Sequence, residues 1–147
     1  MSVPVRRALS LTMFMSVSAA AIVLAGQAAG PAASAGWVKT PAPGETTAMA
    51  FATINNPTMY DVYFTSGTTD AAGSVQLRDK SKGADQKAQT ITFIIVPAYG
   101  SLAMDQNGVY LLLQNLKRPL KDGETVTLML STSDGAKLQV PAAVRKQ

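Results

Sequence analysis

The sequence has 147 residues, 47% of them hydrophobic, with a formal net charge of +4 and neither cysteine nor histidine. The lack of these two residue types excludes disulfides, Ser-His-Asp and Cys-His nucleophiles, and zinc sites that use histidine. The length suits a single domain with a modest hydrophobic core.

The first 35 residues follow the pattern of a secretory signal peptide. Arg6 and Arg7 precede an apolar run over residues 8–25, and the small residues that follow end in Ala33-Ser34-Ala35. A basic segment, an apolar segment and an A-x-A site together predict export and cleavage. The apolar run approaches the ~20 residues that span a bilayer, so an uncleaved anchor is the alternative. Gln27 stands where a lipoprotein signal would place its lipidated cysteine, so no lipid can be attached there.

Cleavage near Ala35 would leave residues 36–147 as one domain in the periplasm. Loss of the two signal arginines lowers the net charge to about +2. The basic residues of segment 78–87 alternate with Asp79 and Asp85, which is typical of a solvated loop and does not favour nucleic-acid binding. No carboxylate pair ends a strongly patterned element, so we do not expect an enzyme. We expect a monomer without stable membrane insertion once the signal is cleaved.

The region after Ala35 predicts an all-β domain, because period-two apolar runs alternate with Gly, Pro, Asn and Asp. The β-branched run Thr90–Val96 predicts a central strand, and Asp134-Gly135 predicts a tight hairpin turn. The tail Ala143–Gln147 is expected to fray. A spacing of roughly 8–14 residues between strands indicates a sandwich or barrel. About nine short strands are predicted, at Gly36–Thr40, Thr47–Asn55, Asp61–Ser66, Ser74–Lys80, Thr90–Val96, Ser101–Met104, Val109–Asn115, Thr125–Ser131 and Lys137–Ala142.

Several short segments, taken together in their order along the chain, resemble one protein family. In order and spacing, the series resembles the bacterial periplasmic copper chaperones called PCu(A)C, over about Gly36 to Ala142. The resemblance implies a cupredoxin-like Greek-key β-sandwich. It also implies a periplasmic carrier that delivers Cu(I) to the Cu(A) centre of a terminal oxidase, with an envelope protein or oxidase assembly factor as partner. The segments are Gly36–Thr40 followed by Pro-x-Pro-Gly, Ala50–Asn56, Ala72–Arg78, Pro97–Gly100, Gly108–Leu113 and Asn115–Val126.

The copper ligands of that family are substituted at every position that aligns. Its first histidine falls at Arg78, its first methionine at Ala88 or Gln89, and its His-x-Met pair at Tyr110 and Leu112. Cu(I) is a soft ion that prefers thioether, thiolate or imidazole donors. Arginine has no lone pair to offer, leucine has no donor atom, and a phenol with a pKa near ~10 is a poor Cu(I) ligand. We therefore expect no cofactor, with Cu(I) implied by the resemblance alone.

The methionines after Ala35 are the remaining soft donors. Met104 aligns with an apolar core position, Met129 is out of phase with its apolar neighbours, Met49 opens a strand, and Met59 lies in a loop. Methionine is more often a flexible core residue than a ligand, so a methionine-only copper site is the weaker hypothesis.

Strand parity gives the substituted positions a second interpretation. Tyr110 and Leu112 share one face of their strand, while Val109, Leu111 and Leu113 share the other. With Arg78 nearby, the pair could form an interaction patch for a peptide or an envelope protein. The simpler hypothesis is a plugged site, in which Arg78 stacks on Tyr110 and covers the sheet. Such a contact is worth roughly 0.5–1 kcal/mol at an exposed position.

Overall fold

The computed structural model describes residues 30–81, 85 and 87–146. All regular structure within these ranges is β, and none of it forms a helix that could cross a membrane. The ten strands are β1 (Ala32–Lys39), β2 (Ala48–Asn55), β3 (Val62–Thr69), β4 (Ala72–Asp79), β5 (Gln89–Thr90), β6 (Ile94–Val96), β7 (Ser101–Ala103), β8 (Val109–Leu116), β9 (Thr125–Thr132) and β10 (Lys137–Arg145).

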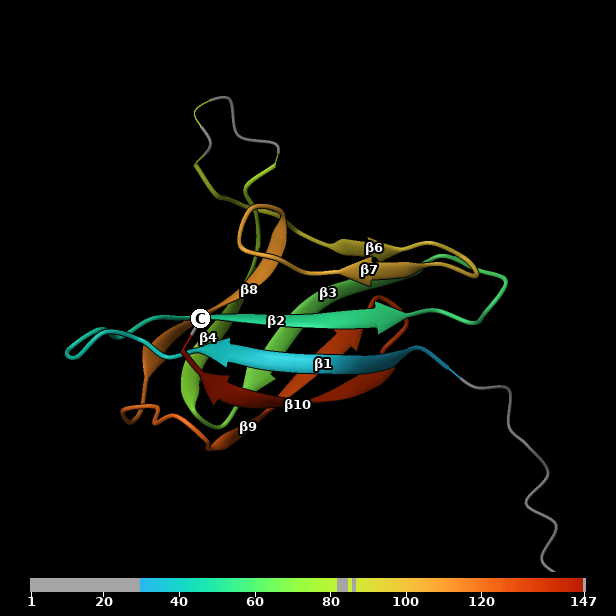
Figure 1. Cartoon of the computed structure of the whole chain (residues 1–147). Helices are drawn as coiled ribbons and strands as arrows, with labels where there is room; N and C mark the ends of the chain where they lie inside the picture. The colour runs from blue at the N-terminus through green and yellow to red at the C-terminus, as the bar shows by residue number, and fades with distance from the viewer. Residues whose placement is uncertain (1–29, 82–84, 86, 147) are drawn as a thin grey trace, which may run out of the picture.

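The long strands close into a barrel-like sheet. Its order is β4-β8-β2-β1-β10-β9-β3, and a pairing of β3 with β4 joins the two ends. Strands β1, β2 and β10 lie side by side at the front of Figure 1, with β3, β8 and β9 behind them. The β1–β10 pair is parallel, whereas the other pairs are antiparallel. The short strands β5, β6 and β7 pair with β4, β3 and β2, respectively, in antiparallel orientation.

The core fills the inside of this sheet. Successive residues of a strand point to opposite faces, and alternate residues of β9 and β10 are accordingly apolar and buried. The other long strands also contribute fully buried apolar residues. On the front strands these are Val38, Ala50, Ile54 and Val144; Leu111 and Leu113 of β8 complete the layer. Tyr110 and Leu112 therefore lie on the outer face, as the parity argument predicted.

The prediction of an all-β domain is confirmed, and β2, β4 and β8 lie within one or two residues of their predicted bounds. The prediction of one central strand at Thr90–Val96 is wrong. The chain forms β5 on β4 and β6 on β3, at the two ends of the strand order. The Ile91 amide still donates to the Leu77 carbonyl at 2.9 Å, so the chain leaves β4 only after residue 91.

The two ends of the domain are also longer than predicted. Strand β10 continues through Arg145, because residues 143–145 pair in parallel with β1 and bury Val144. The fraying predicted from Ala143 is therefore wrong for those three residues. Strand β1 begins at Ala32 rather than Gly36, and residues 32–34 pair with the end of β2. Most of the predicted signal peptide, residues 1–29, lies outside the described residues.

Candidate functional site

The strand register brings the substituted positions together. Arg78 of β4 lies directly opposite Tyr110 of β8, and Leu112 lies between Gln76 of β4 and Met49 of β2. Arg78, Tyr110 and Leu112, three of the positions that align with ligands of the PCu(A)C family, therefore lie on neighbouring strands. The fourth aligns with Ala88 or Gln89, and the Arg78 Nη2 donates to the main-chain carbonyl of Ala88 at 2.9 Å.

Arg78 is fixed by hydrogen bonds to the segment that leads into β5. Besides the bond to Ala88, Nη1 donates to Thr90 Oγ1 at 2.8 Å and to Gln76 Oε1 at 3.4 Å. Its Nε is buried and has no partner among the described residues. A permanent cation with no lone pair thus lies next to Tyr110, where a metal-binding residue would have to stand.

Aromatic rings continue this row across the outer face. The Phe51 ring lies 6.2 Å from that of Tyr110 and stacks on Trp37 at 4.6 Å. The Arg145 guanidinium lies 4.5 Å from the centre of the Trp37 ring. Stacking of Arg78 on Tyr110 was expected, but it is not among the cation–π contacts of the described residues. The cation–π contact found there is that of Arg145 with Trp37. Aromatic pairs of this kind contribute about 0.5–1.5 kcal/mol beyond the area that they bury.

These contacts make the outer face less accessible than the sequence suggested. Tyr110 is only 6% exposed and Phe51 only 2% exposed. Leu112 is half-buried. Tyr110 therefore offers little of its ring to a partner, and the face is not a flat exposed patch.

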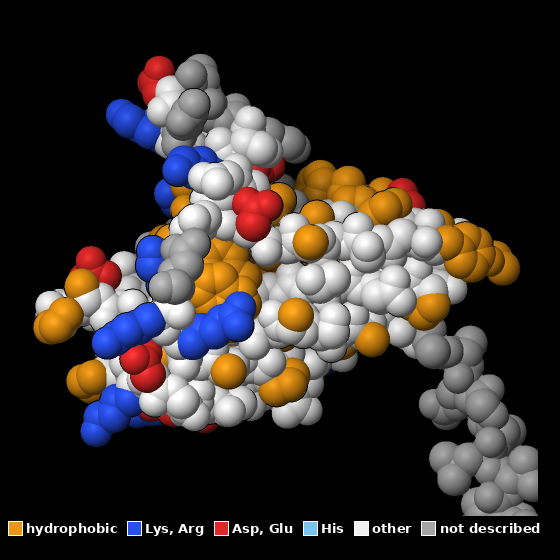
Figure 2. Space-filling model, viewed as in Figure 1, with side chains coloured by type: hydrophobic (Ala, Val, Ile, Leu, Met, Phe, Trp, Pro, Cys, Tyr) orange, Lys and Arg blue, Asp and Glu red, His pale blue; other side chains and the backbone are white. Residues whose placement is uncertain are grey.

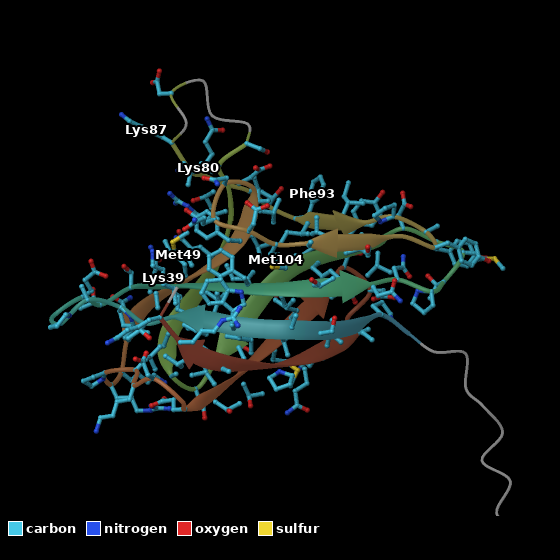
Figure 3. The ribbon with its side chains drawn as sticks, in the orientation of Figure 1. Lys39, Met49, Lys80, Lys87, Phe93 and Met104 are labelled. Atoms are coloured by element: carbon cyan, nitrogen blue, oxygen red, sulfur yellow. The ribbon has the colours of Figure 1, made fainter. Side chains whose placement is uncertain are left out.

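A pocket of about 580 Å³ lies over this face, at the end of the barrel where β2 begins. Met49, Tyr110 and Leu112 form its apolar floor, and the loop 41–43 lies along one side. Its charged lining residues are Lys39, Lys146 and Glu45, and Lys146 lies 3.7 Å from the Asp122 carboxylate. Figure 2 shows apolar side chains with Lys and Arg next to them at this end, and Figure 3 shows Lys39 and Met49 close together there. The arrangement combines an apolar floor with charged groups of both signs at its rim.

The pocket does not supply the donors that Cu(I) requires. Met49 is the methionine in its lining. Met104 is buried in the core, Met59 is exposed in the β2–β3 loop, and Met129 lies on β9, which does not pair with β2. The described residues contain no group of three or more Cys, His, Asp or Glu that could hold a metal ion. One thioether alone does not supply the soft donors that Cu(I) prefers.

Sequence reasoning missed the aromatic row and the position of the loop that lines the pocket. Trp37 and Phe51 belong to strands that were predicted, but their stacking depends on the pairing of β1 with β2, which no local pattern encodes. The loop 41–43 was visible as a Pro-x-Pro-Gly turn, and its position beside Met49 is set by the same pairing.

Comparison with known proteins agrees with this architecture. Residues 32–144 match the family model described as "Putative lipoprotein LpqE-like". A protein of Leifsonia xyli subsp. xyli (strain CTCB07), described as "Putative lipoprotein Lxx21020", is 30% identical over 121 residues, which are 81% of this chain and 72% of the relative.

Solved structures with the same fold include PCuAC domains. The apo PCuAC domain from PmoF1 superposes with a TM-score of 0.71 at 18% identity, over 83% of this chain and 98% of that domain. The solution structure of Cu(I)-loaded DR1885 from Deinococcus radiodurans superposes with a TM-score of 0.64 at 30% identity, over 80% of this chain and 77% of that protein. The resemblance to PCu(A)C proteins inferred from the sequence is thereby confirmed.

Proposed function

We propose a function from one established premise: the chain belongs to the LpqE-like family, and its domain has the fold of PCuAC domains. It is an exported, non-enzymatic binding protein with a cupredoxin-like Greek-key topology, and it works in the periplasm. At the place of the copper site it carries an amphipathic pocket instead. The observation that carries this proposal is the Arg78 guanidinium, which is tied to Ala88 and Thr90 beside the buried ring of Tyr110.

Copper would be the cargo of such a protein, and the chemistry of the four positions argues against it. Loading Cu(I) there would place a positive ion beside a guanidinium that cannot lose its proton. Leu112 has no donor atom, and neither Ala88 nor Gln89 offers a soft one. In copper handling, the protein would therefore act as a partner of an envelope protein or an oxidase assembly factor rather than as the carrier.

The pocket indicates what such a partner would present. Met49, Tyr110 and Leu112 favour an apolar side chain. Lys39 favours a carboxylate on its own side of the pocket, away from Glu45, because Lys146 is already paired with Asp122. The proposed ligand is therefore a protein segment with an apolar residue next to an acidic one. The burial of Tyr110 favours insertion of a side chain into the pocket over contact with a flat patch.

A Cu(I) competition titration of the purified protein tests the proposal. The expected result is no tight binding at one equivalent, with the same weak response from a Met49→Leu variant. Tight binding at one equivalent would overturn the proposal, and loss of that binding in Met49→Leu would place the copper in this pocket.

Export with cleavage near Ala35 is part of the same proposal. The register of β1 against β2 shifts between Ser34 and Trp37, and Ala35 has a φ of 50°. A chain that begins at Gly36 would lose the pairs made by residues 32–34 and keep all pairs with β10. Amino-terminal sequencing of the periplasmic protein should give Gly36 first. A first residue at or before Ala32 would contradict cleavage at this place.

A further inference from the structure

The large hydrophobic side chains that are well exposed in the described residues belong to two short segments. Met59, Tyr60 and Tyr99 are 61%, 72% and 73% exposed, at the tips of the β2–β3 and β6–β7 loops. Tyr63 on β3, Ile95 on β6 and Phe93 just before β6 are also exposed. Single exposed apolar residues are ordinary, but a cluster of this kind indicates a contact surface. We call Met59, Tyr60 and Tyr99 the aromatic tip.

The aromatic tip is held by a rigid frame. The side chain of Asn56 is fully buried, and its Nδ2 donates to the carbonyls of Tyr60 at 2.7 Å and Val96 at 3.1 Å. The Tyr99 amide donates to the Thr58 carbonyl at 2.9 Å, which ties the two loops together. Tyr99 has a φ of 54°, a conformation that costs free energy for a residue other than glycine. The fold therefore holds these apolar side chains in water at a cost.

The amino-terminal segment leaves the barrel at the same end. Ala32 pairs with Asn55, the last residue of β2 before the loop that carries Met59 and Tyr60. Pro31, Tyr60 and Tyr63 line one cavity of about 270 Å³. Figure 1 shows β1 beginning at this end and the carboxyl terminus at the other. The pocket also lies at that other end, because Lys39 at the end of β1 and Lys146 after β10 line it.

We propose that the aromatic tip contacts the membrane interface while the amino-terminal segment is attached, before or without cleavage near Ala35. Residues 8–25 form an apolar run that approaches the length of a membrane span, and it is followed by only six residues before Ala32. A chain held by this run keeps the end of the barrel that carries the aromatic tip within a few residues of the lipid. Tyrosine rings, apolar with a polar end, are enriched at the headgroup level of membranes.

The aromatic tip carries little charge, so it should bind lipid through apolar contacts rather than through attraction to anionic headgroups. Segments 56–64 and 92–100 contain no Lys or Arg and a single acid, Asp61, whose carboxylate accepts from the Ala98 amide. Contact should therefore persist at 1 M salt, where charges are screened beyond about 3 Å. With the tip on the membrane, the pocket at the other end of the barrel faces the aqueous side.

Fluorescence quenching by brominated lipid tests this orientation in the full chain. The protein is made by cell-free synthesis in the presence of phosphatidylcholine vesicles, so that no signal peptidase removes the anchor. Tyr60→Trp reports on the aromatic tip, and Ala42→Trp, on the exposed loop beside the pocket, is the matched control. The native chain, with Trp37 alone, supplies the background that is subtracted from both variants.

We expect brominated chains to quench the Tyr60→Trp signal several-fold more than the Ala42→Trp signal, at low salt and at 1 M salt. Tyr99→Trp is a second reporter with the same expectation, in case one variant folds poorly. Equal quenching at the two ends, or none at the tip, would overturn the proposal and leave the tip to a protein partner. The proposed function is tested separately, because neither reporter alters Arg78, Tyr110 or the Cu(I) titration.

Discussion

Replacement of Asn56 by alanine should destabilise the domain strongly, although no apolar side chain is removed. Its Nδ2 donates to the carbonyls of Tyr60, Val96 and Pro97 at 2.7, 3.1 and 3.1 Å. Its Oδ1 accepts from the Thr58 amide at 3.0 Å and from the Thr58 hydroxyl at 2.7 Å. Each such bond contributes about 0.5–1.5 kcal/mol net, and a buried partner left unpaired costs about 1–3 kcal/mol.

The partners of Asn56 differ in how far they can recover. The groups of Thr58 and Tyr60 lie in a part-buried or exposed loop, where water can replace the amide, whereas the bond to the Val96 carbonyl is buried. We therefore expect a loss of about 3 kcal/mol in the free energy of unfolding, which is less than five independent bonds would give.

Urea denaturation of Asn56→Ala, with Asn55→Ala as the neighbouring exposed control, measures this loss. The midpoint should fall with little change in the slope. Asn56→Asp should be at least as unstable at neutral pH, because a carboxylate cannot donate to the three carbonyls. A loss below about 1 kcal/mol, equal to that of the control, would refute the frame that we describe.

Three further changes test the packing and charge of the barrel. Phe51→Ala removes the middle ring of the aromatic row and should lower the free energy of unfolding by about 3–5 kcal/mol. Thr53→Ala, two residues along the same face, should lower it much less. Equal losses of stability in calorimetry would be inconsistent with the aromatic row. Gly36→Ala would bring a Cβ to 2.4 Å from a β10 carbonyl, so the melting temperature should fall, and an unchanged value would contradict this close approach. The Arg118 side chain, by its hydrogen bond, holds the pKa of Glu124 below its ordinary value. The stability that this hydrogen bond contributes is present above the pKa of Glu124 in the unfolded chain, and it is lost as the pH falls through the pKa in the folded protein. Glu124→Gln should therefore be less stable than the native chain at neutral pH and equally stable in acid. A difference in stability that does not change with pH would contradict this.

Local pattern was sufficient for much of the fold. The apolar run predicted the extent of β8 to within one residue, and strand parity separated the face of Leu111 and Leu113, which are fully buried, from that of Leu112, which is half-buried. The hairpin at Asp134-Gly135 was equally clear, since Gly135 has a φ of 90°.

Long-range pairing decided the parts that the sequence did not predict. The apolar run from Thr90 to Val96 divides between two strands because its first part pairs with β4 and its last part with β3. The burial of Tyr110 depends on Phe51, which is 59 residues away in the chain and comes close through the pairing of β2 with β8. The substituted positions could be named from the resemblance, but the hydrogen bonds that fix Arg78 could not.

The central claim is that the fold keeps the place of a copper site while the donors are gone. The most direct test restores them in one chain with Arg78→His, Ala88→Met, Tyr110→His and Leu112→Met, and compares its Cu(I) titration with that of the native protein. Because the register places Arg78 opposite Tyr110 and Arg78 contacts Ala88, the folded variant should gain tight binding at one equivalent where the native protein shows none. Tight binding by the native protein, or none by a variant whose melting curve shows that it is folded, would contradict the account.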